Sequence, residues 1–148
     1  MPYLRITCSE LDAQTRRSIA ERLTDEVNDL FYNPRAKITR AELRDRTTVH
    51  FTPYGDEELF IGGRTPLERG ARDITVELSD WNMSTRLRRR IARVLTPALA
   101  EAFGVPPTDL DGINLRFHAY RPSEFAVGGH LLSVMIPFVV QVLKRLAG

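Results

Sequence analysis

The chemistry of the residue at position 2 depends on its place in the chain. The sequence of 148 residues begins Met1-Pro2, and a strand-like stretch follows at once. Proline has no backbone N–H to give to a sheet, so it is tolerated at strand starts and sheet edges. If Met1 is removed, Pro2 carries a free secondary amine at the tip of a strand, which can act as a base or a nucleophile. Position 2 is therefore the first candidate for catalysis, and a structural strand-start proline is the alternative.

Other reactive side chains are scattered along the sequence. The three histidines, His50, His118 and His130, form no recognisable metal motif, so we expect no metal. Cys8 is the single cysteine. It excludes an internal disulfide, suits a reducing cytosol, and is typical of a small core residue more than of a nucleophile.

Charge and hydropathy favour a protein of the cytoplasm that binds neither nucleic acid nor membrane. The formal net charge is only +2, and the arginines within 86–93 are most simply the solvated face of a helix. The apolar stretch 134–143 is too short to span a bilayer and contains Pro137, so we interpret 134–148 as a C-terminal packing helix. No leader with a basic region before an apolar run is visible.

The chain contains an internal repeat. Segment 48–63, TVHFTPYGDEELFIGG, aligns without a gap on 114–129, NLRFHAYRPSEFAVGG, at a shift of 66 positions. Upstream, two apolar helical stripes align at a shift of 72, with Ile19 on Ile91, Leu23 on Leu95, Val27 on Leu99 and Phe31 on Phe103. The sequence therefore predicts one domain of two similar units, 2–63 and 74–133, joined by a linker over 64–73.

Each unit is expected to fold as strand, helix, strand. Alternation predicts strands over 2–8, 47–52, 74–78 and 113–120, with Asp12 and Ser84 as helix caps. A strand–helix–strand crossover is parallel and right-handed. Two such units predict an α+β fold with a four-stranded sheet and both helices on one face. We expect the bare face, with Thr7, His50 and Arg116, to be an apolar area buried against other copies of the chain.

This combination resembles the tautomerase superfamily, the group that contains 4-oxalocrotonate tautomerase. Its members start with proline after methionine removal, repeat a β-α-β unit, and end the unit with an apolar-x-apolar-Gly-Gly hairpin. Here the hairpins read LFIGG at 59–63 and FAVGG at 125–129. In length and in its first hairpin, the chain is also similar to the fused two-unit members of the cis-3-chloroacrylic acid dehalogenase type. The resemblance covers roughly residues 2–133.

The resemblance implies an enzyme without a cofactor. It implies that Pro2 is the catalytic amine of a tautomerase-like isomerase that moves a proton on a small carboxylated enol or oxo acid. Ile74 stands at the position of Pro2 in the second unit, so each chain offers one amine. Three fused chains supply the six units of the family's ring, which implies a homotrimer. The alternatives are a hydrolytic dehalogenase, hydratase or decarboxylase of a small unsaturated acid, and a catalytically inactive trimeric member.

The sequence departs from the family in its substrate-binding arginines. Neither turn after a unit's first strand contains one, and the position of a second family arginine holds Thr48 in one unit and Asn114 in the other. Arg116 lies two residues beyond Asn114, on the same strand face, and guanidinium suits a planar carboxylate. Phe125 matches the family's aromatic wall. We therefore expect Arg116, Phe125 and Asn114 to bind the substrate.

Two of these residues also have a purely structural interpretation. Arg116 can serve a subunit interface, and Phe125 can pack the hairpin. The weaker candidates are the linker arginines and the hairpin glutamates, namely Arg64, Arg69, Arg72, Glu57, Glu58 and Glu124. If Pro2 lies in an apolar pocket beside Phe125 and near a cation such as Arg116, both surroundings disfavour the ammonium form and lower the pKa of the amine.

Overall fold

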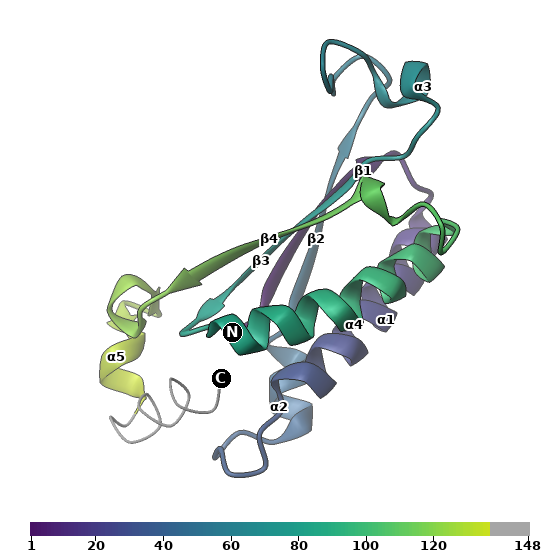
Figure 1. Cartoon of the computed structure of the whole chain (residues 1–148). Helices are drawn as coiled ribbons and strands as arrows, with labels where there is room; N and C mark the ends of the chain where they lie inside the picture. The colour runs from purple at the N-terminus through teal and green to yellow at the C-terminus, as the bar shows by residue number, and fades with distance from the viewer. Residues whose placement is uncertain (137–148) are drawn as a thin grey trace.

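The computed structural model describes residues 1–136 and contains the two expected units. The first consists of β1 (Tyr3–Ser9), α1 (Ala13–Phe31) and β2 (Thr48–Tyr54). The second consists of β3 (Ile74–Trp81), α4 (Thr85–Phe103) and β4 (Ile113–Tyr120). The two long helices lie side by side against one face of the sheet (Figure 1).

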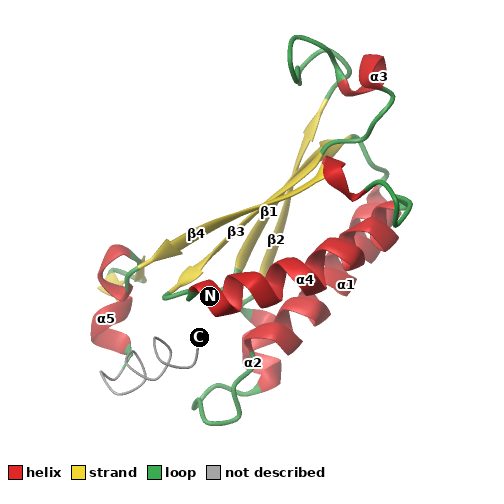
Figure 2. Ribbon diagram, in the orientation of Figure 1, coloured by secondary structure: helices red, strands yellow, loops and turns green. Residues whose placement is uncertain are grey.

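The four strands form one mixed sheet in the order β2-β1-β3-β4 (Figure 2). Within each unit the two strands are parallel, β1 with β2 and β3 with β4. The units meet through the antiparallel pair of β1 and β3, in which Leu4 faces Leu78 and Ile6 faces Val76. The predicted α+β fold is confirmed, and the two units are related by an approximate two-fold axis through this central pair.

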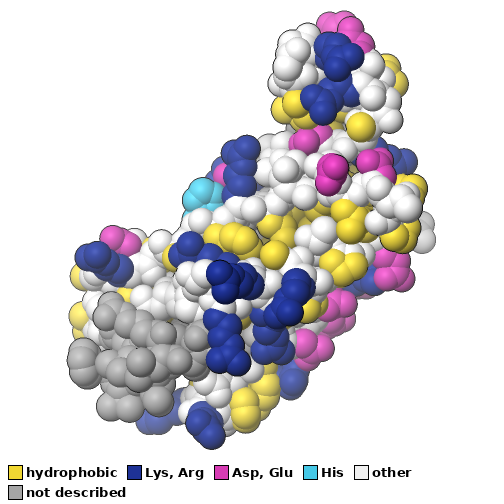
Figure 3. All heavy atoms as spheres, in the orientation of Figure 1, with side chains coloured by type: hydrophobic (Ala, Val, Ile, Leu, Met, Phe, Trp, Pro, Cys, Tyr) yellow, Lys and Arg dark blue, Asp and Glu magenta, His cyan; other side chains and the backbone are white. Residues whose placement is uncertain are grey.

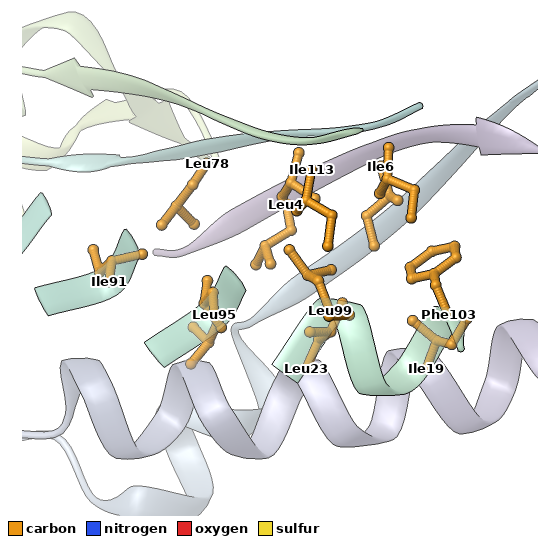
Figure 4. Close-up of a cluster of buried hydrophobic side chains, with 14 of the residues drawn as sticks. Leu4, Ile6, Ile19, Leu23, Leu78, Ile91, Leu95, Leu99, Phe103 and Ile113 are labelled. Atoms are coloured by element: carbon orange, nitrogen blue, oxygen red, sulfur yellow. The ribbon is translucent and has the colours of Figure 1, made fainter. Parts of the chain in front are cut away.

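The core lies between the sheet and the helices because strand side chains alternate between two faces. One face of β1 and β3 is apolar and buried, and it meets the apolar stripes of α1 and α4 (Figure 4). Leu4, Leu23, Leu78, Ile91 and Leu95 are 0% exposed there.

Local signals in the sequence fix where the helices begin. The Asp12 carboxylate accepts a hydrogen bond from the Thr15 N–H at 2.9 Å, and the Ser84 hydroxyl accepts one from Leu87 at 3.2 Å. Each satisfies an N–H that has no partner within the first helical turn. Both predicted caps are therefore confirmed.

Several short elements were not predicted. α2 (Arg40–Asp45) and α3 (Pro66–Arg69) both begin with a capping box. η1 (Leu110–Gly112) and η2 (Pro122–Glu124) were not predicted either. β5 (Ala126–Val127) and β6 (His130–Leu131) pair as the hairpin expected around Gly128-Gly129, and α5 (Leu132–Met135) overlaps the start of the predicted C-terminal helix. The segment with α3 projects beyond the end of the sheet (Figure 1). Of the predicted C-terminal helix over 134–148, residues 137–148 lie outside the described part of the chain.

The open face of the sheet is polar, so the expectation of an apolar face was wrong. Tyr3 and His50 share a hydrogen bond of 2.7 Å between the phenol oxygen and Nδ1. Glu77 lies 3.4 Å from Arg5 and 3.3 Å from His118. The alternation that buries one row of β1 and of β3 brings Tyr3, Arg5 and Glu77 to the opposite face.

None of the helices within residues 1–136 is both long enough and apolar enough to cross a membrane.

Candidate active site

Pro2 lies buried at the entrance to β1. Its carbonyl oxygen accepts a hydrogen bond from the Thr48 N–H at 3.0 Å, which ties the start of β1 to the start of β2. In the antiparallel register Tyr3 faces Ser79, so one further step places Pro2 opposite Asp80. Directly opposed residues of such a pair have Cβ atoms about 4.5–5.5 Å apart. The sheet therefore brings an acid to the residue that the sequence selects for catalysis.

The terminal nitrogen contacts this acid directly. The Met1 ammonium lies 2.7 Å from Oδ1 of Asp80, whose side chain is 1% exposed. Figure 1 shows the N-terminus beside the end of β3 and the beginning of α4. Covalent bond lengths keep the Pro2 nitrogen within about 4 Å of the Met1 nitrogen. The Pro2 nitrogen, which becomes terminal when Met1 is lost, therefore lies within about 7 Å of this buried carboxylate.

Two aromatic rings line the same end of the sheet. Tyr120 ends β4 opposite Trp81, and its ring stacks on Phe125 with centroids 5.2 Å apart. Burial first, and then the charge of Asp80, raise the pKa of the Tyr120 phenol. The hydroxyl therefore stays protonated at ordinary pH and remains a hydrogen-bond donor. Of the sequence candidates, Phe125 is thus placed at the same end as Pro2.

The repeat shows where the Tyr120 hydroxyl is aimed. In the first unit Tyr54 occupies the equivalent position and donates to the carbonyl oxygen of Asp73 at 2.8 Å. Asp73 corresponds to Met1 at the shift of 72 that relates the strand starts. The pseudo-equivalent acceptor for Tyr120 would therefore stand at residue 1. The Tyr120 hydroxyl has no hydrogen-bond partner among the described residues, so a donor is left available at the amine end.

Unpaired buried donors gather at this end of the chain's second unit. Four buried side-chain atoms in the described residues lack a partner. Three of them are donors: Asn82 Nδ2, Arg88 Nε and the Tyr120 hydroxyl. Asn82 directly follows β3 with φ of 50°, and its backbone N–H donates to the Tyr120 carbonyl at 3.0 Å. Because an unmet buried donor is costly, this grouping favours a ligand that brings acceptor oxygens, such as a carboxylate.

Arg88 was missed as a site candidate because the arginines of this segment were interpreted together as a solvated face. That interpretation fits the exposed members Arg86, Arg89, Arg90 and Arg93. Basic side chains gather over α4 (Figure 3). Arg88 is half-buried. It lies three residues before buried Ile91, hence on the same helix face, and that spacing was a signal in the sequence.

Arg116 and Asn114 lie elsewhere in the chain. Both are exposed on the open face of β4. Arg116 is four residues before Tyr120, or about 13 Å along the strand, and Asn114 Nδ2 donates to the Asp73 carboxylate at 3.3 Å. Within one chain the structure does not bring these two residues to Pro2. Their predicted role in substrate binding requires a neighbouring chain.

The remaining candidates are held by hydrogen bonds within the fold, are unreactive, or are not grouped so as to bind a metal ion. Glu58 accepts the Gly55 N–H at 2.7 Å, and its repeat equivalent Glu124 accepts the Arg121 N–H at 2.7 Å. Burial, and then the charge of Glu10, raise the pKa of the Cys8 thiol to about 11, which keeps it unreactive at neutral pH. Within residues 1–136 no three His, Cys, Asp or Glu side chains are placed to hold a metal ion.

Comparison with known proteins shows which solved structures share this fold. No protein-family profile matches the chain, and no curated protein matches it by sequence. Among solved structures, Pt0534 inactivated by 2-oxo-3-pentynoate aligns with a TM-score of 0.71 at 16% identity, over 91% of this chain and 99% of that one. A wild-type fused 4-OT in an asymmetric trimer aligns with a TM-score of 0.73 at 11% identity, over 91% of this chain and 99% of that one.

A member of the cis-3-chloroacrylic acid dehalogenase family aligns with a TM-score of 0.66 at 16% identity, over 96% of this chain and 97% of that one. These matches run over nearly the whole length of each protein. The chain therefore has the fold of the fused tautomerase-superfamily proteins, and the resemblance found in its motifs holds for the whole architecture.

Proposed function

We propose that the protein is a tautomerase-like isomerase that moves a proton on a small carboxylated enol or oxo acid. The Pro2 amine, freed by loss of Met1, carries the proton. The observation that carries the proposal is the grouping of unpaired buried donors, from Asn82, Arg88 and Tyr120, at the end of the sheet where the terminal amine lies. A carboxylate and an enol oxygen supply the acceptors that these donors lack.

Each residue then has a separate task. The amine exchanges a proton with the substrate, and the donors orient the carboxylate so that the reacting carbon faces the nitrogen. Phe125 supplies an apolar wall beside Tyr120. Arg88 is the cation of the same chain, whereas Arg116 and Asn114 would contribute from the open face of a neighbouring chain.

A reactive 2-oxo acid tests the amine directly. Pt0534 was inactivated by 2-oxo-3-pentynoate, whose triple bond is conjugated to a carbonyl. We expect the Pro2 nitrogen to add to this triple bond, with no leaving group, so that the intact mass rises by the full mass of the reagent and peptide mapping locates it on Pro2. Turnover of a panel of enolpyruvates should be lost in step with labelling. Labelling of another residue, or none, would contradict the proposal.

A second candidate is a hydratase, dehalogenase or decarboxylase of a small unsaturated acid. The observation that favours it is Asp80, because a carboxylate beside the amine favours the protonated form. An ammonium can give a proton to one substrate carbon while water adds to the neighbouring carbon, with later loss of halide in a dehalogenase, or while the C–C bond to the carboxylate breaks and carbon dioxide leaves in a decarboxylase. A panel of haloacrylates assayed beside the enolpyruvates distinguishes this class from an isomerase.

We further propose that the protein is a homotrimer. Because the open face is polar, the apolar contacts must come from elsewhere, and large apolar side chains are exposed at both ends of the sheet. Phe60 and Leu67 are 57% and 78% exposed near the projecting α3 segment, and Leu131 and Met135 are 44% and 54% exposed beyond β4. Packing one end against the other end of the next copy is a heterologous contact, which forms a closed trimer when its rotation is about 120°. The fused 4-OT neighbour is itself a trimer.

Light scattering should therefore give about three times the chain mass of 16.9 kDa. Leu67→Asp should weaken the assembly, because it places a charge in the apolar contact. The matched change Glu57→Asp, on the same projecting segment, should leave it intact. A monomer at micromolar concentration would contradict the trimer.

A further inference from the structure

Asp80 occupies one of two pseudo-equivalent places in the sheet. Continuing the β1–β3 register by one step at each end places Pro2 opposite Asp80 and Cys8 opposite Ile74. At the shift of 72 that relates the two units, Ile74 is the equivalent of Pro2, and Asp80 is the equivalent of Cys8. The two pairs are therefore related by the two-fold pseudosymmetry of the chain and provide an internal comparison.

The two pairs differ in charge. At one end Cys8 and Ile74 are both 2% exposed, and the thiol stays neutral because burial raises its pKa to about 11. At the other end the pair contains a buried acid. The acid thus occurs only where the chain has a terminal nitrogen. A structural requirement of the fold for an acid would apply to both ends, since the strands pair in the same way at each.

A buried carboxylate needs a cation near it. Leaving an ionised carboxylate isolated in an apolar interior is very unfavourable, and a close cation with good hydrogen-bond geometry offsets that cost. The ammonium 2.7 Å from Asp80 supplies this partner. When Met1 is lost, the positive charge is carried by the Pro2 nitrogen, which lies at most about 4 Å from the position of the Met1 nitrogen. The Asp80 carboxylate is still opposite Pro2 in the β1–β3 pairing.

We propose that Asp80 is the positioning residue of the active site, which holds the freed Pro2 amine as an ammonium so that the resting enzyme presents a proton donor. The inference rests on the proposed function of the Pro2 amine. It reverses the expectation that an apolar pocket and a cation keep the amine neutral, because Arg116 lies on the open face and an acid stands next to the nitrogen.

The resting charge decides which step begins catalysis. With an enol, the C=C electron pair takes a proton from the ammonium nitrogen and forms the new C–H bond. The neutral amine then removes the proton from the enol oxygen, which becomes the carbonyl, and the ammonium is restored. Atoms and charge balance without a further reactant. Turnover of the enol then falls as the pH rises through the pKa of the amine, since the proton donor is lost there.

Other titratable and charged groups face the same end. Tyr120 of β4 stays a neutral phenol beside Asp80. Arg88 of α4, half-buried one turn before Ile91, adds a like charge from the helix side that opposes the effect of Asp80. Glu77 lies three residues before Asp80 on β3 and points to the open face, where it contacts Arg5 and His118. Glu77 therefore provides a control acid on the same strand.

The experiment titrates the amine without any substrate. In protein labelled with ¹⁵N-proline, Pro2 is the only amine among the nine prolines once Met1 is lost, so its nitrogen resonance is distinct. We expect the titration midpoint to fall by about one pH unit or more in Asp80→Asn, because an opposite charge this close shifts a pKa by about 1–3 units. Glu77→Gln should leave the midpoint unchanged. Asp80→Cys copies the pseudo-equivalent residue and replaces Asp80→Asn if that variant does not fold.

Each outcome is decisive. An equal midpoint in wild type and in whichever Asp80 variant folds overturns the inference, while the amine can still be catalytic, as labelling by 2-oxo-3-pentynoate would show. Equal shifts in the Asp80 and Glu77 variants also overturn it, because they indicate a general charge effect. Failure of both Asp80 variants to fold assigns the acid to stability and overturns the inference too. Intact mass is measured in every case, and retention of Met1 overturns both the inference and the proposed function.

Discussion

Protein that retains Met1 is expected to lose turnover by about a hundredfold to ten-thousandfold, the usual contribution of a positioned general acid or base. With Met1 in place the Pro2 nitrogen is an amide, which neither accepts nor gives a proton at neutral pH. The Met1 ammonium keeps its contact with Asp80, so the local charge is preserved. The loss of turnover is therefore due to the changed position and type of the terminal amine, because a cation is still present beside Asp80.

The measurement compares kcat/KM for two forms of the protein, one with and one without Met1 by intact mass. Pro2→Ala, also freed of Met1, is the matched variant because it keeps a terminal amine. It should lose only part of the activity, since the proline ring restricts the direction of the lone pair. Circular dichroism and light scattering check that fold and assembly are unchanged. Full activity in the form that retains Met1 would exclude an amine mechanism.

The second large effect concerns the cation that binds the substrate's carboxylate. Arg88→Ala is expected to raise KM about tenfold to a hundredfold with little change in kcat. A charge-assisted hydrogen bond contributes about 1.5–3 kcal/mol, and its loss weakens ground state and transition state alike. Arg88 is chosen because its Nε is buried at the amine end of the chain and has no hydrogen-bond partner within residues 1–136. Arg88→Lys should restore only part of the affinity, because a lysine cannot form the paired contact.

Two other arginines serve as comparisons. Arg89→Ala removes an exposed charge one residue further along α4 and should leave KM unchanged. Arg116→Ala tests a contribution from a neighbouring chain and should raise KM by less, at most about fivefold, as for an exposed charge screened by solvent. If Arg116→Ala raises KM strongly and Arg88→Ala does not, then Arg116 is the cation that binds the carboxylate, as its spacing on β4 predicted, and the choice of Arg88 is wrong.

Much of the fold could be predicted because its signals are local or repeated. The stripes of α1 and α4, the caps Asp12 and Ser84, and the two hairpins are all visible in the sequence. α2 and α3 also carry a local signal, the capping boxes that begin at Thr39 and Thr65, but they lie in segments that were treated as connections. The polarity of the open face was equally available, since Arg5 and Glu77 alternate with core residues.

The site was harder to predict because it depends on pairing between distant strands. Pro2 was predicted from its place in the chain, and Phe125 from the hairpin motif, and both stay predictions. Asp80 was interpreted as part of a turn, since β3 was expected to end at Leu78, whereas it runs to Trp81. Only the antiparallel register of β1 and β3 shows that Asp80 stands at the terminal nitrogen. That register follows from the order of the strands in the sheet, which no short motif specifies.

The pseudo-equivalence of the two ends of the central strand pair also bears on protein engineering. The Cys8–Ile74 end has the same backbone as the Pro2–Asp80 end but no chain terminus. Opening the linker just before residue 74 would create a second terminus at the start of β3. With Ile74→Pro and Cys8→Asp, the opened chain would carry the amine and its acid twice. A single scaffold thus provides both the proposed site and a blank copy of it, on which the minimal requirements for that site can be rebuilt one residue at a time.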